Sequence, residues 1–196
     1  MRNQKYLALD LELNSKRDGT TPKIIEVGIS IGSPQEPENL QTFNWYLDPQ
    51  EPIHPEIVKL TGITDELIKT RAVSHKTLAE ELSALIKLHD VFVNPITWGG
   101  DDATELLQEF RDQDIHFPHF GRRIIDVKTI FVFQQIVAGK SPVGGLRKSM
   151  IANGLEFIGT PHRAHVDAEN TLRFFFHYLH RQKVFEDFKD VMKTLK

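Results

Sequence analysis

Cysteine is absent from the 196-residue chain, and so is any long apolar run. Without cysteine the protein has no disulfide, no thiolate metal site and no cysteine nucleophile. No apolar segment reaches the length of a membrane span, and residues 1–4 do not read as a basic-then-apolar signal segment. We therefore expect a cytoplasmic protein with no membrane partner.

The chain also lacks an excess of positive charge. The chain has 24 Lys and Arg against 27 Asp and Glu, so its formal net charge is −3 and no overall basic field attracts polyanions. If nucleic acid is the partner, we expect local contact at a strand end rather than along a duplex. The composition is otherwise that of an ordinary globular protein, and the length fits one domain covering residues 1–196.

The pattern of apolar residues and turn signals predicts an α/β protein. Three strands, at 6–13, 23–31 and 40–47, are joined by short connections and form an antiparallel meander. Helices are expected at 56–60, 64–69, 74–88, 101–113, from 128 to about 137, 145–153, 165–182 and 186–195, and further strands at 91–98 and 123–127. This order predicts a mixed five-stranded sheet, three antiparallel strands followed by two parallel ones, flanked by helices.

Two carboxylates lie on the first expected strand. Because strand side chains alternate between faces, Asp10 and Glu12 share one face and the leucines between them take the other. Adjacent like charges on a buried strand are costly unless positive charge neutralises them. A divalent cation would do so. The same spacing recurs at Asp167 and Glu169, so the strand setting, rather than the pattern itself, supports this hypothesis.

A third acid is expected where a strand ends and a helix begins, a common position for ligand sites in α/β sheets. Helix phase selects Asp102, which shares an inward stripe with Leu106 and Phe110. The adjacent Asp101 falls on a solvent-facing stripe, where a helix-capping role explains it. Asp126 is likewise expected to cap the helix that follows it.

A third group precedes the long aromatic helix near the C-terminal end. Asp167 borders the core stripe of this helix, whereas Glu169 falls on its wetter side. His162 lies in the loop before the helix, where a base can move over a bound substrate. His165 is the alternative base, although a position at the helix start is the better explanation of it.

Four acids and a histidine thus occur in a fixed order: Asp10, Glu12, Asp102, His162 and Asp167. With the segments LALDLELN, TWGGDDATELL and HRAHVDAENT, this order resembles the DEDDh family of 3′–5′ exonucleases over most of the chain. The resemblance implies an RNase H-like (DnaQ-like) fold. The Trp98–Gly99 pair is similar to the branch of histone-mRNA and small-RNA-trimming exoribonucleases and their bacterial relatives.

The resemblance also implies a chemistry. Two Mg²⁺ or Mn²⁺ ions would be held by Asp10, Glu12 and Asp167, with Asp102 acting directly or through water, since hard cations prefer oxygen ligands. Two ions roughly 3.5–4 Å apart activate water and stabilise the departing oxygen. His162 would be the general base, a task suited to a side chain with an ordinary pKa of about 6.5. The expected reaction releases nucleoside 5′-monophosphates from single-stranded RNA or DNA 3′ ends, with RNA favoured.

Substrate contacts are expected from a further set of residues: Leu13, Asn14, Thr61, Gly62, Ile63, Trp98 and Arg163. The Thr61–Ile63 segment resembles a family loop near the terminal nucleotide, although core packing explains Ile63 equally well. Leu13 and Asn14 stand where many relatives carry Thr or another small residue. Arg163 suits a phosphate contact, with a solvated surface position as the alternative.

Two other functions stay open. A catalytically silent protein could use the same fold to bind RNA or a protein partner, and it would bind no metal. A zinc enzyme could use His177 and His180, one turn apart on a helix, as half a site, but no third ligand is evident nearby. The sequence does not set the oligomeric state, and a homodimer is one option.

Overall fold

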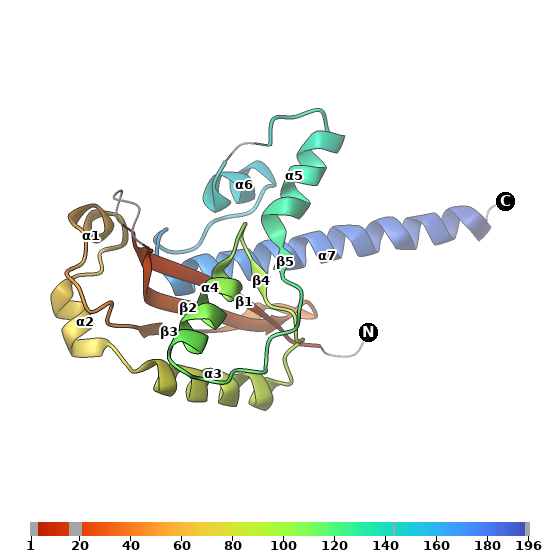
Figure 1. The fold of residues 1–196 in the computed structure, drawn as a ribbon. Helices are drawn as coiled ribbons and strands as arrows, with labels where there is room; N and C mark the ends of the chain where they lie inside the picture. The colour runs from red at the N-terminus through yellow and green to blue at the C-terminus, as the bar shows by residue number, and fades with distance from the viewer. Residues whose placement is uncertain (1–3, 16–20, 143, 195–196) are drawn as a thin grey trace.

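A mixed five-stranded sheet forms the centre of the computed structural model, which describes residues 4–15, 21–142 and 144–194. The strands are β1 (Tyr6–Asn14), β2 (Lys23–Ser33), β3 (Glu36–Tyr46), β4 (Ile96–Thr97) and β5 (Ile125–Asp126). They lie in the order β3-β2-β1-β4-β5 (Figure 1). The first three pair antiparallel, and β4 and β5 extend the sheet in parallel. The predicted mixed sheet is therefore confirmed.

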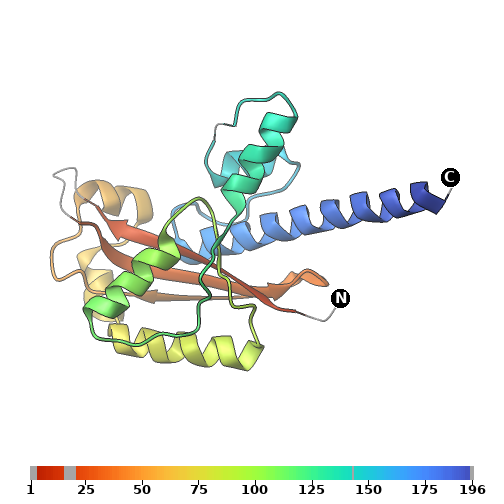
Figure 2. The same cartoon turned by 45° about the vertical axis from the view of Figure 1, so that its right-hand side comes forward.

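Helices cover both faces of this sheet. They are α1 (Pro55–Thr61), α2 (Asp65–Arg71), α3 (His75–His89), α4 (Asp102–Asp112), α5 (Val127–Val137), α6 (Leu146–Ala152) and α7 (Ala164–Thr194). Apolar residues of α3 and α4 pack on one face of β1 and β2. Those of α5, α6 and α7 form a second core on the opposite face (Figures 1 and 2). Strand β1 thus lies between two cores, which explains why its apolar residues outnumber its polar ones.

Two expected strands are shorter than predicted. The segments 91–98 and 123–127 contribute two residues each, and Val91 makes an isolated bridge with Lys5. Pro95 has no amide hydrogen to donate to a sheet, which is why pairing resumes only at Ile96. Strand β3 is longer than predicted, because residues 36–39 belong to it instead of forming a connection, with Glu36 in register with Ser33 of β2.

The C-terminal end was predicted as two helices, and this was wrong. Residues 164–194 form the single helix α7, since no Gly or Pro interrupts residues 183–185. In both views the second half of α7 projects beyond the sheet (Figures 1 and 2). No helix in the described part of the chain is long and apolar enough to cross a membrane. The last residue of the predicted final helix, Leu195, lies outside the described residues.

The start of α7 lies directly against the backbone of β2. A Cβ atom on Gly28 would come 2.0 Å from the backbone nitrogen of His165 and 2.1 Å from the carbonyl carbon of Ala164. Only glycine leaves room for this approach. Gly28 is also the register partner of Asp10. The contact therefore brings the first turn of α7 beside the strand that carries the acids.

We predict that Gly28→Ala destabilises the protein by about 3 kcal/mol or more, because the added methyl group overlaps backbone atoms that have no rotamer to change. Chemical denaturation followed by far-UV circular dichroism measures the loss. Gly145→Ala is the control. Its Cβ meets no atom within 4 Å and its φ is −79°, so we expect a loss of at most about 1 kcal/mol, because alanine caps α6 less well than glycine. Equal unfolding free energies for the two variants would contradict the close contact at Gly28.

Candidate metal and catalytic site

The two acids of β1 point toward the face of the sheet that α7 covers. Ala8, two residues before Asp10, packs in the core formed with α7, whereas Leu9 and Leu11 pack in the core formed with α3 and α4. Asp10 and Glu12 therefore lie on one face, as strand alternation predicts. The side chain of Glu12 is nearly buried, with 9% of its surface exposed.

Both acids line a cleft of about 680 Å³. Asp167 and His162 line the same cleft, so residues more than 150 positions apart in the sequence meet there. Trp98, after β4, forms part of its apolar wall and stacks on Phe174 with ring centroids 5.7 Å apart. Positive charge is contributed by α6, whose Arg147 and Lys148 also line the cleft.

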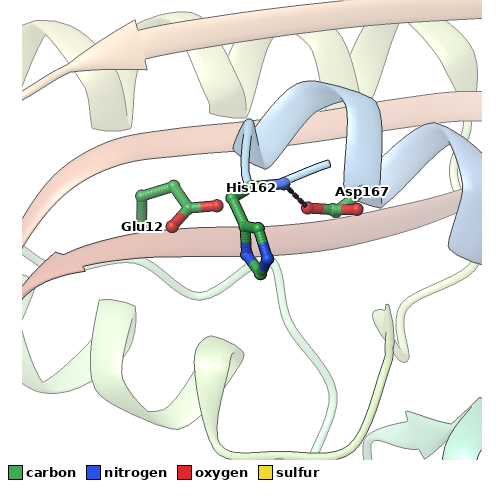
Figure 3. Close-up of side chains that lie close together, drawn as sticks. All are labelled: Glu12, His162 and Asp167. Carbon is green, nitrogen blue, oxygen red and sulfur yellow. Dashed lines mark hydrogen bonds between the residues drawn. The ribbon is translucent and has the colours of Figure 1, made fainter. Parts of the chain in front are cut away.

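Glu12, His162 and Asp167 form the tightest group of potential ligands. Their donor atoms lie within 4.8 Å of one another, and Figure 3 shows His162 between the two carboxylates. The backbone N–H of His162 donates a 2.8 Å hydrogen bond to Oδ2 of Asp167. His162 has a φ of 63°, a left-handed conformation that few non-glycine residues adopt. The hydrogen bond to Asp167 compensates this conformation and ties the loop to α7.

The electrostatics of the cleft are dominated by repulsion between carboxylates. Burial raises the pKa of Asp10 well above its usual value, and the charges of Asp102, Asp167 and Glu12 raise it further. Burial is also the main reason that the pKa of Glu12 rises to about 8 and that of Asp102 to about 7. The pKa of Asp167 is raised by burial as well. These groups can be ionised together at neutral pH only if positive charge is added, and a divalent cation supplies it.

The choice between Asp101 and Asp102 made from helix phase agrees with the structure. Asp102 is the first residue of α4, and its charge is the largest neighbouring contribution to the pKa of Asp10. Asp101 is exposed at the N-cap position, where its side chain accepts no capping hydrogen bond within the described residues. Asp126 does cap its helix, since its carboxylate accepts a 2.9 Å hydrogen bond from the amide of Lys128 in α5. It also accepts a 2.8 Å hydrogen bond from the amide of Gly99, after β4.

Glu26, which contacts the start of α7 next to the cleft, was not predicted from the sequence. It is the register partner of Glu12 on β2 and is completely buried. Burial acts to raise its pKa, but hydrogen bonds from His165 and Arg163 outweigh burial and lower the pKa to about 2. A lone glutamate within the apolar segment KIIEVGISI was the available signal. Nδ1 of His165 lies 3.2 Å from Oε1 of Glu26, so His162, rather than His165, lies beside Glu12 and Asp167.

Several residues expected to contact substrate form hydrogen bonds within the protein instead. Oδ1 of Asn14 accepts a 2.8 Å hydrogen bond from the amide of His54. Thr61 donates to the carbonyl of Ile57 (2.8 Å) and accepts from the amide of Ile63 (3.0 Å). Ile63 has no exposed surface, so the packing interpretation accounts for it. Contacts of Asn14 and Thr61 with a nucleotide stay predictions.

The other residues expected to contact substrate lie in different surroundings. Gly62, with a φ of 75°, ends α1 in the left-handed conformation. Leu13 is half-buried beside the core that α3 and α4 cover. The guanidinium of Arg163 is bonded to Glu26 and to the hydroxyl of Tyr46. Of the described side chains proposed to contact substrate, Trp98 is the one that lines the cleft.

The half-site proposed for zinc finds no third ligand in the described chain. The group formed by Glu12, His162 and Asp167 is the one set of three or more potential ligand residues detected there, and it excludes His177 and His180. The ring of His177 instead packs near Phe174 and Tyr178. The described structure therefore offers no support for a zinc enzyme built on this helix.

Comparison with known proteins identifies a family. The profile of the exonuclease family RNase_T matches residues 7–175. No curated protein sequence matches the chain significantly.

Solved structures share the fold at low identity. The nuclease domain of 3′hExo, a DEDDh family member bound to rAMP, superposes with a TM-score of 0.77 at 17% identity, covering 92% of this chain and 94% of that one. The cell-death related nuclease CRN-4 gives 0.75 at 19% identity, with coverages of 91% and 64%. The zinc-ion form of E. coli exonuclease I with single-stranded DNA gives 0.68 at 15% identity, with coverages of 95% and 43%.

The raised pKa values predict a pH-dependent stability. In the metal-free protein the free energy of unfolding should fall as pH rises from about 4.5 to about 8, because folded Glu12 holds its proton up to a pKa of about 8 and the unfolded chain releases it near 4.5. Mg²⁺ or Mn²⁺ should restore stability, most strongly at the alkaline end of this window. Thermal denaturation with chelator and with metal measures both effects.

Two matched variants test the cause. Glu12→Gln removes the charge and should flatten the pH dependence, stabilise the metal-free protein by about 1–3 kcal/mol at alkaline pH and weaken the metal effect. Glu169→Gln changes the other Asp-x-Glu glutamate, which is bonded to Thr42 outside the cleft, and should leave the metal effect intact. A wild-type melting temperature that changes neither with pH nor on addition of metal would contradict this account.

Proposed function

The chain belongs to the RNase_T exonuclease family and has the fold of its DEDDh members, and from this we propose that it is a metal-dependent 3′–5′ exonuclease. It releases nucleoside 5′-monophosphates from the 3′ ends of single-stranded nucleic acid. The observation that carries the proposal is the meeting of Asp10, Glu12 and Asp167 with His162 in one cleft. Carboxylates with an adjacent imidazole are the groups that metal-assisted phosphodiester hydrolysis requires.

The proposed cofactors are two Mg²⁺ or Mn²⁺ ions. Asp10, Glu12 and Asp167 would hold them, with Asp102 acting directly or through water, because oxygen donors suit hard cations. When bound, the ions supply positive charge that activates water and stabilises the departing oxygen. The zinc-ion form of E. coli exonuclease I supports a divalent ion in this fold.

His162 acts as the general base in this proposal. Its side chain is exposed in the cleft and lies beside both Glu12 and Asp167, so it can take a proton from a water molecule that attacks phosphorus there. The bond that breaks joins phosphorus to the 3′ oxygen of the preceding nucleotide, so the phosphate stays on the released nucleoside. Asp167 holds the backbone of His162 at the cleft through a 2.8 Å hydrogen bond.

The substrate is a single strand, with RNA favoured over DNA. Trp98 and Phe157 give the cleft apolar surface against which a terminal base can stack, and Arg147 and Lys148 place positive charge near its phosphates. The rAMP bound to 3′hExo supports a ribonucleotide product, whereas E. coli exonuclease I holds single-stranded DNA. A cytoplasmic location belongs to the same proposal.

The activity is tested with a 5′-labelled single-stranded RNA, and a matched DNA beside it, in Mg²⁺ or Mn²⁺. We expect a ladder that shortens from the 3′ end, faster on RNA. Asp10→Asn should abolish it, and His162→Ala should slow it by roughly 10²–10⁴-fold through loss of the base.

His180→Ala, on the far part of α7, is the control and should retain full activity. If neither RNA nor DNA is shortened with either metal, the proposal is wrong. Strand binding without cleavage would then indicate the catalytically silent binding protein.

A further inference from the structure

The buried carboxylate of Glu26 collects hydrogen bonds from the start of α7. The guanidinium of Arg163 is bidentate on it, with Nη2 3.1 Å from Oε1 and Nε 3.3 Å from Oε2. The backbone N–H of Ala164 donates to Oε2 at 3.1 Å, and Nδ1 of His165 lies 3.2 Å from Oε1. From β3, the side-chain amide of Asn44 adds a 3.0 Å hydrogen bond. One strand residue thus binds three consecutive residues of the helix start.

Those three residues adjoin the catalytic candidates on both sides. His162 directly precedes Arg163, and Asp167 follows His165 by two positions. On the strand side, Glu26 is the register partner of Glu12, the ligand that faces both of them. Glu26 therefore connects β2 directly to the helix start that carries His162 and Asp167.

Close packing alone, without directional hydrogen bonds, would not fix the position of the first turn of α7 on the sheet. Gly28 allows α7 to approach the sheet, but a smooth contact lets a helix slide or rotate. The bidentate pair with Arg163 and the bond to the Ala164 amide fix translation and rotation of the first turn together. Because Glu26 has no exposed surface, water does not compete for these bonds.

We propose, on the basis of the exonuclease function above, that Glu26 is a positioning residue, which through Arg163, Ala164 and His165 holds His162 and Asp167 against Asp10 and Glu12. Arg163 then serves the protein rather than a substrate phosphate. Substituting Glu26 should loosen metal binding and slow catalysis, while binding of the nucleic acid strand is little changed.

The test compares Glu26→Gln with Glu109→Gln. Glu109 is a matched control, because its carboxylate also accepts from a backbone amide, that of Ile24 at 3.2 Å, and from a histidine, His75 at 2.9 Å. It lies on α4, outside the cleft. For Glu26→Gln we expect Mn²⁺ affinity by titration calorimetry and kcat each to fall by about 10–100-fold, the loss typical of groups that orient metal ligands. KM for a single-stranded RNA should stay within about threefold, and Glu109→Gln should match wild type in all three.

Arg163→Gln provides a second route if Glu26→Gln does not fold. If Arg163 works through Glu26, this variant loses Mn²⁺ affinity and kcat. If Arg163 instead binds a substrate phosphate, KM rises, its dependence on salt weakens and Mn²⁺ affinity is unchanged. The double variant should lose no more than the worse single variant, because the two residues act as one unit.

The outcomes separate the two proposals. Wild-type Mn²⁺ affinity in Glu26→Gln, or a pure KM effect in Arg163→Gln, would overturn the positioning role whether or not the wild type is an exonuclease. A wild type that binds Mn²⁺ but cleaves nothing would overturn the exonuclease function alone, and the calorimetry of the two variants would still decide the role of Glu26.

Discussion

Repulsion among carboxylates is the constraint on which this structure depends. Asp10 and Glu12 share a strand face, and the fold adds Asp102 and Asp167 to the same region, so each charge raises the cost of the others. A chain selected for stability alone would not bring these groups together. The arrangement becomes favourable when divalent cations bind, which makes metal binding and folding two parts of one balance. Helix α7 is held in this costly position by close packing at Gly28 and by directional bonds from Glu26.

Much of the arrangement of the acids could be predicted from local sequence pattern. Strand alternation is a period of two, so Asp10 and Glu12 had to share a face wherever β1 came to lie. Helix phase chose Asp102 over Asp101 by the same kind of argument. The shortness of β4 could not be predicted, because the segment 91–98 is mostly apolar and Pro95 is the main signal of the interruption. The single helix α7 was divided in two, although its sequence contains no breaker.

Glu26 escaped prediction for a different reason. Its partners Arg163 and His165 are 137 and 139 residues away in the chain, and nothing periodic connects them. Asn14 and Thr61 are the opposite case, since they were predicted to contact substrate but form hydrogen bonds within the protein. Both are polar residues in expected ligand-binding segments, yet the fold uses their hydrogen-bonding groups itself. A sequence shows which residues can bind a ligand, but only tertiary contacts show which are already bound.

The central claim is that the acids of β1 and α7 form a site for two divalent cations. A crystal structure grown with Mn²⁺ and a nucleoside 5′-monophosphate tests it most directly, because anomalous scattering locates manganese independently of the protein coordinates. The account predicts two peaks roughly 3.5–4 Å apart, bounded by the carboxylates of Asp10, Glu12 and Asp167, with the phosphate against them. Manganese bound elsewhere on the molecule, with no anomalous peak among these carboxylates, would contradict it.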